Sequence, residues 1–440
     1  MTQYFGTDGI RGSYGSELIN EAFADKFGQA IGTYLTQNNS GQIVVAIASD
    51  NRPSSPSLKK SLADGLNRKA IKVIDFGVTP TPALAYGVIK HKADFGLMVT
   101  ASHNPASDNG LKCFNEFGTK LRVEEENIIE ELIGKSPSDS VFSENIVPIS
   151  VLDDYLGNIE SHFAKLNLSG LSIALDCANG ATCQTTHRVL QTFGAKVLKI
   201  HHGDGVINSD CGSEHLASLQ KLIREKKADL GIAHDGDGDR VRFIDNHGDV
   251  IDGDQVLGLI ALQADQDKVL ENGNFVSTIH SNSGLMSFFE SHQINGLTSN
   301  VGDRNVFLKM VESKSNWGGE SSGHIICRDY LPTGDGLFAA LYVLNAIISE
   351  KKSLTNLAQQ VQLWPSISGS FHASQKPPIQ SMPEMFQSLQ SCEEYLGQEG
   401  RILLRYSGTE PKLRLLVEGK SAEKINLVFE RLKNAIEKSL

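Results

Sequence analysis

Three aspartates alternate with glycines directly after a short apolar segment. The run His234-Asp235-Gly236-Asp237-Gly238-Asp239-Arg240 follows the apolar residues 230–233. Carboxylate oxygens are hard ligands that suit Mg²⁺ or Ca²⁺, and glycines let the backbone turn tightly enough for the acids to converge. We therefore predict that Asp235, Asp237 and Asp239 hold one divalent cation. A solvated acidic turn would not need this spacing, and a calcium-binding hand would need a terminal Glu and flanking helices.

A serine stands on the loop after a second apolar segment. Residues 95–100 predict a buried strand, and Ala101-Ser102-His103-Asn104-Pro105 follows it. In open α/β folds ligands bind at the carboxyl ends of the strands, which favours a chemical role for the Ser102 hydroxyl. No Gly-x-Ser-x-Gly elbow surrounds it, so a serine hydrolase is not favoured. A turn or helix-cap serine remains the alternative.

Two further loops carry groups that suit a phosphosugar. The run Arg405-Tyr406-Ser407-Gly408-Thr409-Glu410-Pro411 combines a guanidinium, hydroxyls and a glycine, as a phosphate-binding loop does. The run Gly318-Gly319-Glu320-Ser321-Ser322-Gly323-His324 offers hydrogen-bonding partners for sugar hydroxyls. Each of them alone is equally typical of an ordinary Gly/Ser loop.

Together these four runs and Phe5-Gly6-Thr7-Asp8-Gly9-Ile10-Arg11-Gly12 resemble one family, the α-D-phosphohexomutases. Their order and spacing match the family along the whole chain. The serine loop, its continuation Asp108-Asn109-Gly110-Leu111-Lys112 and the C-terminal loop are most similar to the bacterial branch that interconverts glucosamine 6-phosphate and glucosamine 1-phosphate. Two residues depart from the family pattern: Ser321 replaces the usual Gln or Asn, and His234 replaces an apolar residue.

The resemblance implies a phosphoserine mechanism and a role for each loop. Ser102 would carry a phosphate, give it to a sugar monophosphate to form a bound bisphosphate, regain one from the other sugar position, and also contact the Mg²⁺. The implied catalytic residues are Ser102, Lys112, Arg11, His103 and Arg240. The implied substrate-binding residues are Glu320, Ser322, His324, Arg304, Arg405, Ser407, Gly408, Thr409 and Arg414. We expect Lys112 to be the general acid/base, with a pKa depressed by neighbouring cations.

Interconversion of the glucosamine phosphates would supply the synthesis of UDP-N-acetylglucosamine and of cell-wall precursors. Three alternatives to this function stay open. A phosphomannomutase or phosphoglucomutase would share the catalytic groups and differ in the sugar loop. A metal-dependent sugar phosphatase would release phosphate. A non-catalytic sensor would be expected to lose Ser102 or one of the metal acids, and the chain keeps them all.

Composition is that of a soluble globular protein. The 440 residues are 40% hydrophobic and 21% charged, and the net charge of −11 argues against a nucleic-acid partner. Six cysteines without Cys-x-x-Cys spacing predict free thiols in a reducing compartment. The N-terminus shows no targeting signal, and the longest apolar run, 337–348, is too short to span a bilayer. We expect a cytoplasmic monomer or homodimer that binds no membrane.

Alternating strand and helix patterns recur three times and predict α/β domains. The first covers residues 1–148, the second 149–249 and the third 250–365, each ending in one of the Gly-rich loops, and residues 366–440 predict a small α+β domain. Asn295-Gly296 predicts a turn within the third. The expected fold class is therefore three similar α/β domains with mixed sheets and a C-terminal α+β domain around a central cleft.

Overall fold

The computed structural model describes residues 4–38, 41–135, 146–407 and 411–440. They form two compact units, one of Met1–His280 with Ile294–Gln359 and the other of Ser281–Gln293 with Gln360–Leu440. We call these the large and the small unit. No helix in the described part of the chain is long and apolar enough to cross a membrane.

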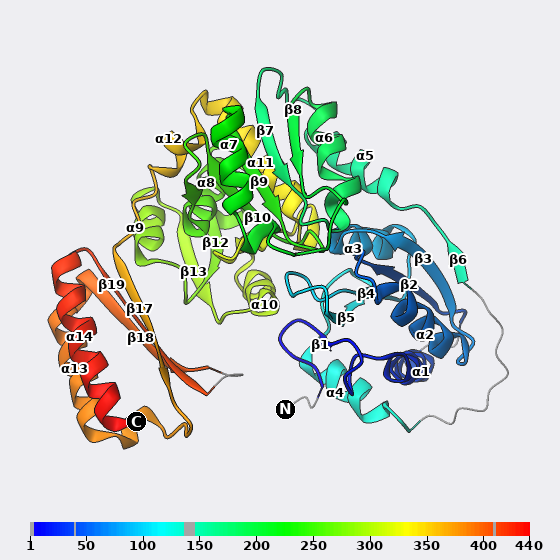
Figure 1. The fold of residues 1–440 in the computed structure, drawn as a ribbon, viewed down its shortest axis with the longest axis horizontal. Coiled ribbons are helices and arrows are strands. Elements are labelled where there is room, and N and C mark those ends of the chain that lie inside the picture. The colour runs from blue at the N-terminus through cyan, green and yellow to red at the C-terminus, as the bar shows by residue number, and fades with distance from the viewer. Residues whose placement is uncertain (1–3, 39–40, 136–145, 408–410) are drawn as a thin grey trace. The chain divides into compact units, whose positions relative to one another are not determined.

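The first sheet of the large unit has the strand order β1-β5-β4-β2-β3-β6 (Figure 1). Its strands are β1 (Ile10–Ser13), β2 (Val44–Ser49), β3 (Lys72–Val78), β4 (Phe95–Val99), β5 (Asp108–Asn115) and β6 (Ile146–Pro148). The helices that accompany it are α1 (Glu21–Asn38), α2 (Ser55–Asn67), α3 (Thr81–Lys90) and α4 (Val123–Leu132). Strands β2, β3, β4 and β6 pair in parallel, whereas β5 runs antiparallel to both β4 and β1.

The second sheet has the order β11-β10-β9-β7-β8, and the third has β13-β12-β14-β15-β16. The second comprises β7 (Ser172–Asp176), β8 (Lys196–Ile200), β9 (Leu230–His234), β10 (Val241–Asp245) and β11 (Val250–Ile251), with α5 (Leu152–His162), α6 (Thr186–Thr192) and α7 (Ala217–Lys226). The third comprises β12 (Asn274–Thr278), β13 (Asn295–Ser299), β14 (Trp317–Gly319), β15 (Ile325–Cys327) and β16 (Leu331–Gly334), with α8 (Gly253–Gln266), α10 (Asp303–Ser313), α11 (Gly336–Glu350) and α12 (Leu354–Ala358).

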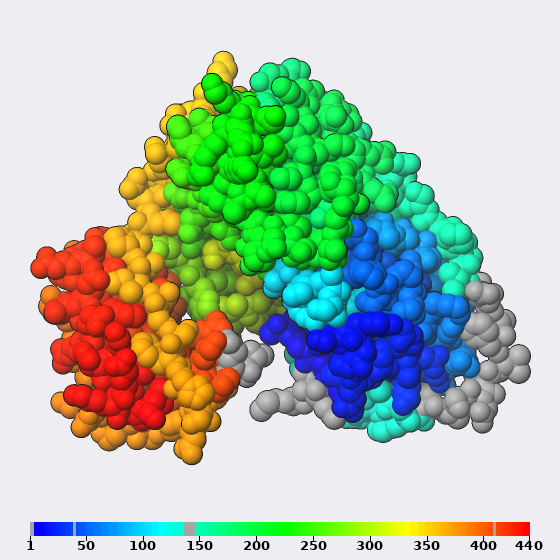
Figure 2. Space-filling view, viewed as in Figure 1, coloured from blue at the N-terminus to red at the C-terminus, as the bar shows by residue number. Residues whose placement is uncertain are grey.

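The three sheets share one topology, which places the three predicted functional loops at equivalent positions. In each sheet three parallel strands are followed by an antiparallel strand, and the turn between the last parallel strand and this antiparallel strand carries the loop. The serine loop joins β4 to β5, the metal loop joins β9 to β10, and the sugar loop joins β14 to β15. In the space-filling view the green residues of the second domain lie against the blue and cyan residues of the first (Figure 2).

Successive apolar side chains of the central strands point to opposite faces of the first sheet, so a hydrophobic core forms on each face. Val45 and Ile47 of β2 pack with α1 and α2, while Ala46 and Ala48 pack with α3. Burial on both faces explains the near-continuous apolar run of this strand. The same arrangement fixes which strand ends meet at the edge that carries the loops.

The small unit is an antiparallel sheet covered on one face by helices. Its strands are β17 (Ser366–His372), β18 (Gly400–Tyr406) and β19 (Lys412–Gly419), in the order β17-β19-β18, and its helices are α9 (Ser283–Ser291), α13 (Pro383–Leu396) and α14 (Ala422–Ser439). Leu413, Leu415 and Val417 of β19 point into the core that α13 and α14 complete. The alternation of buried and exposed residues is that expected for a one-sided sheet.

The predicted fold class is confirmed in its three α/β sheets and C-terminal α+β part. The predicted turn at Asn295-Gly296 is wrong. Asn295 begins β13, whose residues pair in parallel with those of β12 from Asn274 onward. Pairing with a buried strand therefore outweighs the local preference of Asn-Gly for a turn.

Candidate active site

The serine, metal and sugar loops meet within the large unit. The Ser102 hydroxyl donates a 2.6 Å hydrogen bond to Asp235 Oδ2 of the metal loop. Val241, which follows the metal loop, donates its backbone N–H to Gly323 O of the sugar loop at 3.1 Å. The equivalent turns of three sheets thus form one site.

A strained backbone and a buried arginine hold the serine in place. Ser102 is fully buried and lies in the left-handed region with a φ of 52°. Its N–H donates to Thr100 Oγ1 at 2.9 Å, and it lies in a turn between β4 and β5, where no described helix begins. The Arg52 guanidinium donates to the serine loop and to Asp50, its acceptors being the carbonyl oxygens of Ser102, Asn104, Pro105 and Asp108 and the Asp50 carboxylate.

The metal loop brings three carboxylates together in a buried position. One oxygen from each of Asp235, Asp237 and Asp239 lies within 4.8 Å of the others. Asp237 Oδ1 and Asp239 Oδ1 are buried and have no hydrogen-bond partner among the described residues. Buried carboxylate oxygens without a hydrogen bond are costly, and hard oxygen donors are what Mg²⁺ prefers. This donor set fits a divalent cation, so the residues predicted from the sequence can hold one.

The glycines of this loop are required by its geometry. A Cβ at Gly236 would lie 2.7 Å from Ser102 O, closer than real Cβ atoms come to backbone oxygens. Gly238 has a φ of +73°, where a side chain would be strained. The Gly-Asp alternation therefore lets the acidic loop approach the serine loop closely.

His234 has a structural place beside the metal loop. It is buried, with its Nε2 3.1 Å from Thr186 Oγ1 and its Nδ1 3.0 Å from Arg240 O. Burial lowers the pKa of His234 to about 4. A neutral imidazole thus fills the position where the family pattern has an apolar residue.

Lys112 lies among carboxylates, which corrects the expected cause and direction of its pKa shift. Its Nζ is 2.8 Å from Asp237 Oδ2, 3.0 Å from Asp239 Oδ2 and 3.1 Å from Asp8 Oδ2. Burial by itself would lower the pKa of Lys112, but these three carboxylates raise it well above its usual value. The predicted depressed pKa is therefore wrong, because acids rather than cations surround the ammonium.

Three further predicted residues surround the serine and the acids. Arg11 contacts Asp8 and donates from Nη1 to Ala101 O at 3.3 Å. Arg240 places Nε 3.9 Å from Asp239 Oδ1, and although burial opposes it, the nearby carboxylates raise the pKa of Arg240. His103 Nδ1 lies 3.3 Å from Ser102 Oγ, and burial followed by the charge of Arg240 lowers the pKa of His103.

Most of the predicted sugar-binding residues already have partners within the protein, and these partners differ from residue to residue. Glu320 Oε1 accepts the backbone N–H of Gly302 at 2.9 Å, and Ser322 lies in the turn that follows. His324 is buried between Asp239 and Asp303. Burial by itself would lower the pKa of His324, but these two carboxylates outweigh it and raise the pKa. Both guanidinium ends of Arg304 pair with Glu126, so this arginine joins α10 to α4.

A pocket of about 430 Å³ opens beside the sugar loop in the large unit. His324, Asp303 and Arg304 line it together with Lys120 and the apolar side chain of Phe307. Its lining includes neither Ser102 and the three aspartates nor Glu320 and Ser322, so this hollow lies beside the predicted catalytic groups and does not enclose them.

The predicted phosphate loop belongs to the small unit. Arg405 of β18 and Arg414 of β19 are directly paired across the sheet. The carbonyl oxygen of Ser407 accepts a 2.6 Å hydrogen bond from the Lys376 ammonium. Arg414 is exposed and Arg405 is partly exposed. Gly408 and Thr409 lie outside the described residues.

Sequence reasoning missed several residues that hold the site. Lys120 contacts both Asp8 and Asp303, and Asn208 Nδ2 donates to Ser102 O at 2.7 Å. Asp8 belongs to the N-terminal run of residues 5–12 that resembles the family, so the sequence could have indicated its place in the site. Lys120 and Asn208 stand in stretches with no distinctive spacing, and only their buried partners reveal them.

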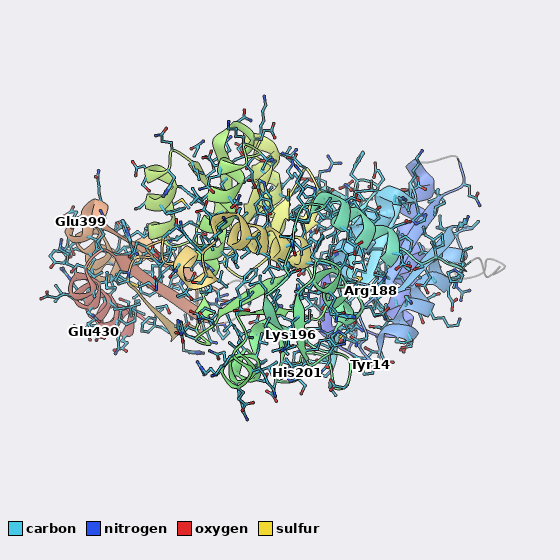
Figure 3. All side chains as sticks on the ribbon, turned by 90° about the horizontal axis from the view of Figure 1, so that it is seen from above. Tyr14, Arg188, Lys196, His201, Glu399 and Glu430 are labelled. Atoms are coloured by element: carbon cyan, nitrogen blue, oxygen red, sulfur yellow. The ribbon has the colours of Figure 1, made fainter. Side chains whose placement is uncertain are left out.

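A second group of possible metal ligands lies in the second domain. Asp176, Cys211 and His201, which directly follows β8 and is labelled in Figure 3, have side-chain ligand atoms within 4.8 Å of one another. The carboxylate of Asp176 already accepts the N–H of Ala178 at 2.8 Å and of Gly212 at 3.1 Å, and contacts His201 Nδ1 at 2.8 Å. Burial raises the pKa of the Cys211 thiol to about 12. This satisfied group fits a structural role.

Comparison with known proteins agrees with this arrangement of domains and loops. The family models described as phosphoglucomutase/phosphomannomutase alpha/beta/alpha domains I, II and III match residues 2–139, 153–248 and 252–363, and that of the C-terminal domain matches 371–435. The chain belongs to the phosphoglucomutase/phosphomannomutase family. The resemblance read from the motifs is thereby confirmed.

Two relatives that match this chain over nearly its full length are named phosphoglucosamine mutase. This chain is 37% identical to the phosphoglucosamine mutase of Carboxydothermus hydrogenoformans, with 100% of both chains covered. It is 40% identical to the phosphoglucosamine mutase of Haemophilus influenzae, with 99% of both covered. The solved structure of a phosphoglucomutase/phosphomannomutase family protein from Burkholderia thailandensis matches with a TM-score of 0.82 at 21% identity, covering 100% of this chain and 98% of that one. That structure supports the fold.

Proposed function

We propose that this protein is a phosphoglucosamine mutase that interconverts glucosamine 6-phosphate and glucosamine 1-phosphate. Its full-length relatives carry that name. The observation that carries the chemistry is the Ser102 hydroxyl, which donates a 2.6 Å hydrogen bond to Asp235, one of three buried carboxylates that lie close together. A nucleophilic hydroxyl beside a cation-binding cluster is the arrangement that phosphoryl transfer needs.

The reaction proceeds by two phosphoryl transfers. In the first, the P–O bond to Ser102 Oγ breaks and a P–O bond to the free sugar hydroxyl forms, which gives a bound sugar bisphosphate. The hydroxyl proton leaves the sugar, and one proton ends on Ser102 Oγ. In the second, the other phosphate of the bisphosphate moves to Ser102 Oγ, and the vacated sugar oxygen takes the proton back. No phosphate and no water is consumed in the cycle.

Mg²⁺ held by Asp235, Asp237, Asp239 and the phosphorylated Ser102 would neutralise charge on the transferring phosphoryl group. Lys112, Arg11 and Arg240 supply the remaining positive charge around the serine. Lys112 is held as an ammonium by its three carboxylates, so it begins the step as the acid. It gives a proton to Ser102 Oγ as the P–O bond breaks, and the amine that remains takes the proton of the sugar hydroxyl. His103 keeps hydrogen-bonding distance to the Ser102 oxygen.

Substrate binding is assigned to the other two loops. Glu320, Ser322 and His324 bind the sugar, with Arg304 at the lining of the pocket. Arg405, Ser407, Gly408, Thr409 and Arg414 bind the phosphate that is not reacting. Fixed guanidinium and hydroxyl donors recognise a phosphate with charge-assisted hydrogen bonds.

Phosphoglucomutase or phosphomannomutase activity is the second candidate, because the same catalytic groups serve either sugar and the solved structure with the same fold carries that family name. The decisive experiment follows glucosamine 6-phosphate, glucose 1-phosphate and mannose 1-phosphate by phosphorus NMR, with Mg²⁺ and a trace of sugar bisphosphate to phosphorylate the serine. We expect interconversion of the glucosamine phosphates to be fastest and free phosphate to stay low. Net phosphate release without isomerisation would establish a phosphatase instead.

A further inference from the structure

Six ionisable side chains form a closed ring that joins the metal loop, the sugar loop and the N-terminal run. We call them the charge ring: Asp8, Lys112, Lys120, Asp239, Asp303 and His324. Lys112 Nζ lies 3.1 Å from Asp8 Oδ2 and 3.0 Å from Asp239 Oδ2. Lys120 Nζ contacts Asp8 Oδ1 and Asp303 Oδ2. His324 closes the ring by proximity, with Nε2 3.4 Å from Asp303 Oδ2 and Nδ1 3.7 Å from Asp239 Oδ1, while Nε2 also accepts the N–H of Gly334 at 3.2 Å.

One hairpin supplies both lysines of the ring. Lys112 lies in β5, and Lys120 follows the turn of residues 115–119 and forms a bridge back to Phe114. Asn115 fixes this turn, because its Oδ1 accepts the N–H of Thr119 at 3.1 Å and the Thr119 hydroxyl at 2.8 Å. The two ammonium groups therefore take up neighbouring positions without direct contact, separated by Asp8.

Of the two lysines in the ring, Lys112 contacts the predicted metal ligands Asp237 and Asp239, whereas Lys120 pairs with Asp8 and Asp303. Its side chain is only 10% exposed. Without its charge, Asp8 and Asp303 would lose the cation that they share in a buried place. Asp8 would then compete with Asp237 and Asp239 for Lys112, and Asp303 would draw His324 away from Asp239.

We propose that Lys120 is a positioning residue for phosphoryl transfer, which sets the places of Lys112 and His324 on either side of Asp239 by holding Asp8 and Asp303. The inference rests on the proposed function. The contrasting role is that of a simple connection between segments, such as the nearby pair of Arg304 and Glu126. A displacement of about an ångström at reacting groups is enough to slow catalysis strongly, so the two roles differ in their effect on turnover.

The test removes the charge of Lys120 and keeps its length. Lys120→Met should lower kcat at least about tenfold while KM for the phosphosugar changes less than about threefold, because the ring orients the groups around the serine. Lys120→Arg should restore most of kcat. The matched control is Lys59→Met, since Lys59 Nζ lies 2.8 Å from Asp75 Oδ1 in a similarly buried pair of the same domain. Its kcat should stay at the wild-type value.

A double variant shows whether the effect passes through Asp303. The kcat losses of Lys120→Met and Asp303→Asn should not multiply, and the double variant should be no slower than the slower single one. A kcat for Lys120→Met within threefold of wild type, or a loss that matches a fall in melting temperature and is not restored by arginine, would overturn the inference.

Hydrogen exchange separates this inference from the proposed function, because it needs no turnover. The amides of residues 320–324 should exchange faster in Lys120→Met than in Lys59→Met or wild type. If wild type fails to interconvert glucosamine phosphates, the proposed function fails while this exchange difference still supports the ring. If wild type is active and the exchange and kcat of Lys120→Met are unchanged, only the positioning role is refuted.

Discussion

Ser102 and Asp235 are separated by 133 residues, yet the hydroxyl of one donates a 2.6 Å hydrogen bond to the carboxylate of the other. Both side chains are fully buried. The bond joins the turn between β4 and β5 to the turn between β9 and β10. A phosphate on Ser102 would therefore be held directly beside the carboxylate cluster, where the cation that neutralises it is expected.

Ser102→Ala should abolish turnover and leave the fold and Mg²⁺ binding intact, because the hydroxyl carries the phosphate while the acids hold the metal. Intact-mass analysis should find one phosphate on wild type and none on the variant. Ser107→Ala is the control, since Ser107 is an exposed residue of the same loop. Full turnover by Ser102→Ala, or a stable phosphate at another residue, would rule out this role.

Asp237→Asn should weaken Mg²⁺ binding and lower turnover by orders of magnitude. The change removes one charge from the donor set and also weakens the hold on Lys112, which lies 2.8 Å from Asp237 Oδ2. Titration calorimetry measures the binding, and a chelator should inactivate wild type until Mg²⁺ is returned. Activity that survives both treatments would show that the acidic loop is not a catalytic metal site.

The functional loops could be predicted because each combines an apolar strand with a distinctive polar run. The strand before the acids has the bounds Leu230–His234, and the apolar residues 230–233 had indicated it. Glycine spacing gave the acidic loop its signal, and the structure shows why: Gly236 lies against Ser102 O. Local sequence carried this information because the strand, the turn and the chemistry are neighbours in the chain.

What surrounds each charge could not be predicted, since the partners come from distant segments. Lys112 was expected among cations, but Asp237 and Asp239 reach it from more than a hundred residues away. Lys120 and Asp303 are 183 residues apart and carry no shared motif. The turn expected at Asn295 failed for the same reason, because pairing with β12 decides the conformation there.

The stability of the large unit should depend on the ionisation of Asp335. Asp335 accepts the N–H of Phe338 at 2.9 Å, where it caps α11, and the Tyr155 hydroxyl at 2.8 Å. Burial raises the pKa of Asp335 from its usual 3.8 to about 6, although these hydrogen bonds oppose the rise. The folded state therefore binds a proton more tightly than the unfolded state, and stability falls as the pH rises from about 4 to about 6.

In the variant Asp335→Asn, the new side chain cannot ionise but keeps an oxygen that can accept the N–H of Phe338 and cap α11. The variant therefore isolates the effect of Asp335 ionisation on stability. The free energy of unfolding of the variant relative to wild type should rise by roughly 3 kcal/mol between pH 4 and pH 7. Urea unfolding at a series of pH values measures the difference. A difference that does not change with pH would show that Asp335 titrates in the same way in both states.

Replacement of Arg405 by Ala should raise KM for every phosphosugar tested. A charged, bidentate contact to phosphate contributes about 1.5–3 kcal/mol, so the loss in kcat/KM should be at least about tenfold. Arg431→Ala is the control, because Arg431 is exposed on α14 of the same unit. Kinetics of the Arg405 variant within twofold of wild type would place this guanidinium outside the substrate site.

Glu320 should determine the preference for an amino sugar. Its Oε1 accepts the Gly302 N–H at 2.9 Å, which leaves Oε2 as the oxygen that we expect to bind the ammonium of glucosamine phosphate. Glu320→Gln keeps an oxygen for Gly302 and removes the charge. The ratio of kcat/KM for glucosamine phosphates to that for glucose phosphates should be roughly tenfold to a hundredfold in wild type and fall toward unity in the variant.

The assay compares both sugars at pH 7 with each enzyme. A wild-type preference for glucose or mannose phosphates would overturn the substrate assignment, yet the dependence of turnover on Ser102 would still stand, because the phosphoryl carrier is the same whichever sugar is bound.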